Sequence, residues 1–191
     1  TGVGTEDNVI NGGNNNSVDN GSIGNVVSGI DNDLGETSAV SGNNVSGTGN
    51  TVDTGASFNI VSGSGNSVTD NSNNNSVVGT NNSLDPSSNN DVSGASNTLT
   101  NSNNNVVSGF NNELDASNRN TVGGQNNTLA TSNNNDVTGF GNSLTTSNRN
   151  TVGGQNNTLT TSNSNDVTGF NNTLTSSNNN SAAGQNNALT T

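Results

Sequence analysis

The repeat in residues 150–164, which read NTVGGQNNTLTTSNS, decides the fold of this 191-residue chain. The same pattern returns every 15 residues from Asn75 onward, and at looser spacings of 16–18 residues before it. Each copy starts with Asn, carries an aliphatic residue or alanine two positions later, and a glycine two positions after that. The twelve copies start at Asn8, Asn25, Asn43, Asn59, Asn75, Asn90, Asn105, Asn120, Asn135, Asn150, Asn165 and Asn180.

Each copy has two halves with the period-two alternation of a β-strand. The first half is N-x-V-x-G, whose glycine permits a corner with positive φ. The second half, N-x-L or N-x-V, starts seven residues after the first Asn, as in Asn157-x-Leu159. A 15-residue period is too short for helical repeats of about 33–47 residues. We therefore expect an all-β chain that forms a parallel β-solenoid of about twelve 15-residue coils. It is one domain over 1–191, less regular in 1–74 and regular in 75–191.

The interior must rely on more than apolar packing, because only 23% of the residues are hydrophobic against about 45–50% in ordinary domains. An Asn amide is both donor and acceptor, so inward Asn residues can bond from coil to coil. We predict such ladders, with serines at the second corner from Ser87 to Ser177 and Pro86 also at a corner. In the first coil, Ile10 and Gly12 are expected to take the inward aliphatic and corner glycine positions. The second-half ladder comprises Asn97, Asn112, Asn127, Asn142, Asn157, Asn172 and Asn187.

The composition excludes several functional classes. The chain has no Cys and no His, which removes zinc and haem sites, thiol chemistry and the Ser–His dyad. A net charge of −12 opposes nucleic-acid binding, and no apolar run is long enough to span a membrane. No carboxylate pair suggests a catalytic pocket, and residues 31–35 lack the downstream Glu of a calcium loop. We expect no enzyme activity, cofactor or metal, and the start at Thr1 suggests a mature or trimmed form.

From Thr128 to Thr190, the outward positions of the second half form a two-column array that is uncharged and mostly threonine. Strand geometry spaces them by about 6.7 Å along a strand and about 4.8 Å between coils, and threonine has few rotamers. A rigid array with two regular spacings suits a partner that is itself a lattice, so we predict an ice surface. The alternative is that threonine simply has high strand propensity. Thr131, Thr146 and Thr161 continue the array toward the corner. The predicted ice-binding residues are Thr98, Thr100, Thr128, Ser143, Thr145, Thr158, Thr160, Thr173, Thr175 and Thr190.

Two further groups of residues stand outside this array. Arg119 and Arg149 lie beside the mixed, partly acidic first half, and we expect them to form surface ion pairs with Asp residues of adjacent coils. Three phenylalanines alternate with glutamines just after the corner glycine, which marks a 30-residue double repeat. We expect these rings to fold over the corner and cap the core rather than form an exposed strip. They are Phe110, Phe140 and Phe170.

The motif in residues 120–124 (NTVGG) and 127–129 (NTL) resembles the repeat of grass antifreeze proteins that inhibit ice recrystallisation. The resemblance extends from Asn8 to Thr190 and implies a left-handed β-roll, secretion to the extracellular space, no enzymatic activity and adsorption to ice. Leucine dominates the second half here and threonine is concentrated toward the C-terminal coils. For this reason the predicted ice-binding face comes from this sequence and not from the family.

Residues 75–79 (NSVVG) are also similar to the head repeat of trimeric autotransporter adhesins. Those heads trimerise through exposed aliphatic residues and continue into a coiled coil, whereas this chain has few such residues and no heptad segment. A purely structural solenoid spacer is the remaining alternative. The sequence thus predicts a monomeric ice-binding protein that binds neither nucleic acid nor membrane, and the resemblance to grass antifreeze proteins implies that it is secreted.

Overall fold

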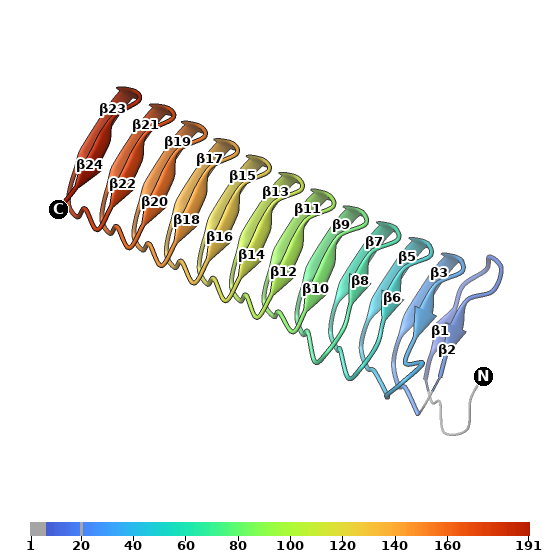
Figure 1. Cartoon of the computed structure of the whole chain (residues 1–191). Helices are drawn as coiled ribbons and strands as arrows, with labels where there is room; N and C mark the ends of the chain where they lie inside the picture. Colours follow the sequence, from blue (N-terminus) through green and yellow to red (C-terminus); the bar gives the residue numbers. More distant parts are fainter. Residues whose placement is uncertain (1–6, 20) are drawn as a thin grey trace. The chain divides into compact units, whose positions relative to one another are not determined.

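A computed structural model describes residues 7–19 and 21–191, which form a parallel β-solenoid of about twelve coils. The chain divides into two compact units, residues 1–100 and 101–191. Within each unit, Figure 1 shows coils stacked one after the next, with one first strand and one second strand per coil. In the described ranges there is no helix that could cross a membrane.

The unit of residues 1–100 contains six coils in its described part. Its first strands are β1 (Val9–Ile10), β3 (Val26–Ile30), β5 (Asn44–Thr48), β7 (Ile60–Ser64), β9 (Ser76–Thr80) and β11 (Asp91–Ala95). Its second strands are β2 (Ser17–Val18), β4 (Asp33–Leu34), β6 (Thr51–Val52), β8 (Ser67–Val68), β10 (Ser83–Asp85) and β12 (Thr98–Thr100).

The unit of residues 101–191 also contains six coils, all with the 15-residue period. Its first strands are β13 (Val106–Phe110), β15 (Thr121–Gln125), β17 (Asp136–Phe140), β19 (Thr151–Gln155), β21 (Asp166–Phe170) and β23 (Ser181–Gln185). Its second strands are β14 (Glu113–Asp115), β16 (Thr128–Ala130), β18 (Ser143–Thr145), β20 (Thr158–Thr160), β22 (Thr173–Thr175) and β24 (Ala188–Thr190).

Neighbouring coils pair in parallel with equivalent residues side by side. Val152 lies between Val137 and Val167 in the first-strand sheet. Leu159 has the same relation to the leucines of β18 and β22 in the second-strand sheet. Val152 and Leu159 are fully buried, whereas the residues that flank them along the strand face outward. The predicted solenoid and its alternation are therefore confirmed.

The buried Asn side chains of the second half satisfy one another and the backbone. The amide of Asn157 donates to Asn142 Oδ1 at 3.0 Å and to the carbonyl oxygens of Gly153 and Gly169 at 3.1 and 3.2 Å. Its own Oδ1 accepts from the backbone and side-chain nitrogens of Asn172 at 3.0 and 2.9 Å. The predicted ladder is thus confirmed, and it stabilises each coil against both neighbours because buried polar groups must be hydrogen-bonded.

A second Asn ladder and a serine ladder line the other end of the interior. The Asn150 amide donates to Asn135 Oδ1 at 3.1 Å and to the Ser162 carbonyl at 2.9 Å. Ser162 donates from its backbone to Ser147 Oγ at 3.0 Å and from its hydroxyl to the Thr160 carbonyl at 2.9 Å. Each coil therefore contributes polar groups that bond in two directions, which supplies the cohesion that the small apolar core lacks.

The first coil corrects two predictions. Ile10 pairs with Val27 in the expected register, but it is 42% exposed because β1 belongs to the outermost described coil. Gly12 does not take the corner glycine position: a Cβ added to it would meet nothing within 4 Å. That position belongs to Gly13, where a Cβ would lie 1.6 Å from the Gly29 oxygen. The one extra residue between the two Asn positions of this coil shifts the glycine.

The connections of the early coils are longer, as the spacing predicts. Nine residues join β4 to β5, whereas five join β20 to β21. Turns occur at 54–55 and 70–71 in these early connections. Pro86 follows directly after β10, at an exposed bend, where it interrupts no strand pairing.

Candidate functional site

The outward residues of five second strands form two columns without a charge, which we call the threonine face. One column runs from Thr128 through β18, β20 and β22 to Ala188, and the other runs from Ala130 to Thr190. All of these positions lie in the unit of residues 101–191. Its hydroxyl residues are Thr128, Ser143, Thr145, Thr158, Thr160, Thr173, Thr175 and Thr190.

The buried leucine column holds the threonine face in place. Leu144, Leu159 and Leu174 are completely buried, each between the two outward residues of its strand. Parallel pairing in exact register then repeats the outward side chains about 4.8 Å apart along the stack. Because each threonine also has a restricted χ1, hydroxyls and methyls occupy a regular two-dimensional pattern.

The hydroxyls of the threonine face are not used by the protein. Within the described residues, none of the eight side chains makes a hydrogen bond to another protein group. The inward serines and asparagines, by contrast, are bonded in every coil of this unit. Face hydroxyls are therefore free to bond to solvent, while their spacing is imposed by the strands beneath them.

The unit of residues 1–100 carries the other two predicted positions. Thr98 and Thr100 lie on β12, where they pair with Ser83 and Asp85 of β10. Both are therefore outward residues of a second strand in the unit of residues 1–100. The neighbouring carboxylate gives their surroundings a charge that the threonine face does not have.

Asp85 is the one acid of this region with a raised pKa. A hydrogen bond with the Asp70 carboxyl, then burial and the charge of Asp70, raise the pKa of Asp85 above its ordinary value of 3.8. Its Oδ1 atom is buried with no hydrogen-bond partner among the described residues. Asp53 behaves oppositely: burial acts to raise its pKa, but hydrogen bonds from Thr37, Thr54 and Ser38 outweigh burial and lower the pKa.

Asp85→Asn is expected to make the protein slightly more stable at neutral pH, by about 0–1 kcal/mol, the range of exposed charge pairs. A raised folded-state pKa means that the folded protein binds the proton more tightly, so stability falls as the pH rises from about 3.8 through that pKa. Urea unfolding followed by circular dichroism between pH 3 and 7 measures the effect. Parallel stability–pH curves for the variant and the wild type would contradict the expectation.

The two arginines do not form the expected ion pairs. Neither Arg119 nor Arg149 is paired with a carboxylate in the part of the chain that the structure describes. Both are exposed, at a corner two coils apart, and they line an open hollow of about 780 Å³ together with Asn133, Asn148 and other Asn residues. Asp136 and Asp166 are exposed at the first positions of β17 and β21.

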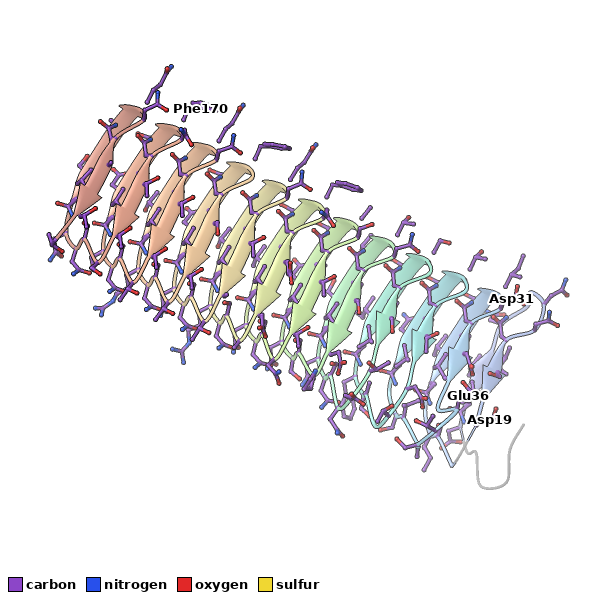
Figure 2. The ribbon with its side chains drawn as sticks, viewed as in Figure 1. Asp19, Asp31, Glu36 and Phe170 are labelled. Atoms are coloured by element: carbon purple, nitrogen blue, oxygen red, sulfur yellow. The ribbon has the colours of Figure 1, made fainter. Side chains whose placement is uncertain are left out.

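The phenylalanines also differ from the prediction. Phe110, Phe140 and Phe170 are 49%, 43% and 41% exposed, so they do not cap the core. Figure 2 shows the Phe170 ring standing away from the ribbon where β21 ends. Each is the fifth residue of a strand whose second residue is the inward valine, so alternation places it on the outward face. The rings thus form an exposed column in which phenylalanine alternates with glutamine.

A third Asn ladder was not recognised in the sequence. Asn133 donates from its backbone to Asn148 Oδ1 at 2.7 Å, and Asn148 donates to Asn163 Oδ1 at 2.8 Å, so these bonds run opposite to the interior ladders. The SN pair near the end of the copies that start at residues 90 to 165 was the available signal. This half-buried ladder stabilises the corner between the second and first strands.

No metal site was found in the described residues, where no three His, Cys, Asp or Glu side chains are grouped to hold an ion. In the segment that resembles a calcium loop, Asn32 is buried and its amide bonds to Asn16 Oδ1 and to the carbonyls of Ser28 and Gly47. This side chain belongs to the ladder.

Comparisons with known proteins give no family: no protein-family model matches the chain, and no curated protein is similar to it. The resemblance to grass antifreeze repeats therefore stays a prediction, and the function must be argued from the residues of the threonine face.

Proposed function

We propose that this protein binds ice through the threonine face and thereby inhibits ice growth and recrystallisation. The observation that carries the proposal is the in-register pair of columns over five coils, uncharged and with hydroxyls that bond to no protein group. A charged side chain would order water around itself in a geometry unrelated to ice. Threonine offers a methyl group and one hydroxyl, so water can be ordered on a lattice that the strands impose.

Rigidity supports the same proposal. Adsorption to a crystal requires many weak contacts at once, and a surface that must first be ordered loses the corresponding free energy on binding. Here the Asn157 ladder, the Ser162 ladder and the buried leucines order the face before it meets ice. The net charge of −12 also keeps copies of the chain apart in solution.

The adhesin alternative would need a continuous exposed aliphatic strip. Val9, Val26 and Ile60 are exposed on first strands, but Asn44 and Ser76 occupy the same column. This interrupted column gives less support to a trimer interface than the threonine face gives to ice binding.

The double variant Thr158→Tyr and Thr160→Tyr tests the proposal. Two bulky rings at the centre of the threonine face should hold ice away from several coils and lower recrystallisation inhibition at least about tenfold, a difference of about 1.4 kcal/mol in binding. The matched control is Thr151→Tyr, which places the same ring on the exposed first-strand side of the same coil. Recrystallisation in frozen sucrose and adsorption of fluorescently labelled protein to a growing crystal are measured.

Full activity in a folded double variant would reject this face. Absence of ice adsorption by the wild type would reject the function itself. Trimers in sedimentation experiments, without any effect on ice, would favour the adhesin alternative. A protein that neither forms trimers nor affects ice would favour the structural spacer.

A further inference from the structure

Three exposed threonines at one corner have a backbone conformation that threonine rarely adopts. Thr131, Thr146 and Thr161 have φ values of 52°, 51° and 52°. A left-handed conformation costs an L-residue about 1–2 kcal/mol, and it is a genuine outlier for a β-branched residue. These three residues, which we call the corner threonines, therefore lower the stability of the folded state relative to Asn or Gly at the same positions.

The same unit shows that the chain has better residues for this conformation. At the corner after the first strands, the left-handed position is filled by Asn126, Gly141, Asn156 and Asn171. Both residue types tolerate positive φ. Asn is also the commonest residue of the chain, yet it is absent from three successive corners next to the threonine face.

No contact within the protein accounts for the corner threonines. The only other left-handed threonine in the described residues, Thr54, has its hydroxyl 3.2 Å from the Thr37 hydroxyl, within hydrogen-bond distance. The corner threonines are exposed, and in the described part of the chain their hydroxyls bond to no protein group. Their side chains thus face solvent.

Their position links them to the threonine face. Each directly follows the outer column, as in Thr145–Thr146 and Thr160–Thr161. The backbone nitrogens of Thr146 and Thr161 donate to the carbonyls of Ala130 and Thr145, both at 2.9 Å, which keeps the corners of adjacent coils in register. Beside the acidic strand β14, the equivalent corner residue is Ala116, also with positive φ. A corner threonine therefore follows three of the uncharged strands, Ser176 takes the same position after β22 with a φ of 54°, and the acidic coil has neither.

We propose that the corner threonines are ice-contacting residues, so that bound ice covers the corner as well as the strands of the threonine face. This inference rests on the proposed function. Residues kept in unfavourable conformations cluster at binding sites, and no protein group in the described residues bonds to these three hydroxyls. A third column widens the contact and adds hydroxyls and methyls at the same coil-to-coil spacing.

The triple variant Thr131→Asn, Thr146→Asn and Thr161→Asn separates a structural role from a binding role. Asn suits the left-handed backbone, so the melting temperature should rise. Ice binding should weaken at least about threefold, because three contacts that together contribute about RT or more are lost. Melting is followed by circular dichroism, and thermal hysteresis and recrystallisation inhibition are compared at equal concentration.

Ala116→Asn is the control, since it relieves the same backbone conformation away from the uncharged columns and should raise the melting temperature without changing ice activity. The triple Gly variant at the corner threonines provides the same two readouts if the Asn variant fails to fold. Unchanged ice activity, or a lower melting temperature, overturns the proposal. If ice activity is unchanged here but lost in Thr158→Tyr and Thr160→Tyr, only this inference fails; if the wild type does not bind ice, the proposed function fails as well.

Discussion

Gly154→Ala is expected to disrupt the pairing of β19 with β21 and to destabilise the protein strongly. A Cβ at this position would lie 2.0 Å from the carbonyl oxygen of Gly169 and 2.9 Å from its carbonyl carbon, both of them backbone atoms that cannot rotate away. Gly154 also has a φ of 108°, which L-residues rarely adopt. The neighbouring coil would have to separate from β19 and lose its parallel pairing. We expect a loss of more than about 4 kcal/mol, a large part of the stability of a typical domain.

The matched control is the adjacent residue. Gly153→Ala would place its Cβ 3.7 Å from Thr168 Cγ2 and 3.8 Å from Thr138 Oγ1, which is ordinary contact. Thr138 and Thr168 occupy the equivalent position in the two neighbouring coils, so the strand already accepts a side chain there. This variant should stay within about 0.5 kcal/mol of the wild type or gain slightly from lower unfolded-state entropy. Urea midpoints that agree for the two variants would contradict the close-packing argument.

Asn157→Ala should destabilise the protein by about 3–5 kcal/mol, because several buried groups lose partners that are worth about 1–3 kcal/mol each. The backbone nitrogen and the amide of Asn172 lose their shared acceptor, and the carbonyls of Gly153 and Gly169 lose a donor. A smaller apolar side chain cannot replace these bonds. Thermal and urea unfolding followed by circular dichroism measure the effect.

Asn156→Gly is the control for this prediction. Asn156 is exposed with a φ of 55°, and the previous coil already has Gly141 at the equivalent position. Its loss should change stability little, since Gly adopts this conformation freely. Equal melting temperatures for the Asn156 and Asn157 variants would show that the interior ladder contributes no more than a surface amide.

Asn157→Asp gives a second test of the ladder with a defined pH dependence. In the wild type the Asn157 amide nitrogen donates a hydrogen bond to Asn142 Oδ1 at 3.0 Å. In the variant an ionised carboxylate oxygen would face that same oxygen, with no proton between them. Burial would raise the pKa of the introduced acid, so the folded state would bind the proton more tightly than the unfolded state. Stability should therefore be highest at low pH and fall as the pH rises through the folded-state pKa.

Most of the fold could be predicted because one short pattern recurs. Period-two alternation places Val152 and Leu159 inward, and stacking repeats the same environment in every coil. The predictions were wrong where a coil does not share this repeated stacking environment. Ile10 lies in the outermost described coil, and the extra residue in that coil moves the corner glycine from Gly12 to Gly13.

The candidate site was predicted less completely. The outward positions of β16 to β24 follow from alternation alone, but whether their hydroxyls are free depends on contacts that a pattern does not describe. The phenylalanines were expected to cap the core, yet Phe170 is exposed on the outward face of β21, three residues after the inward Val167. Long arginine side chains also have many rotamers, so proximity in the sequence did not produce an ion pair.

The amino-acid sequence by itself determined the coil, its period and the residues that point inward, because a strand has only two faces and identical coils must bury identical residues. Only the tertiary structure decided what the corners do. There the chain leaves the regular strand geometry, and the direction of each side chain depends on a φ value set by the coils above and below. For that reason the repeat could predict the threonine face, whereas the backbone conformation of Thr146 and the exposure of Phe170 could not be read from it.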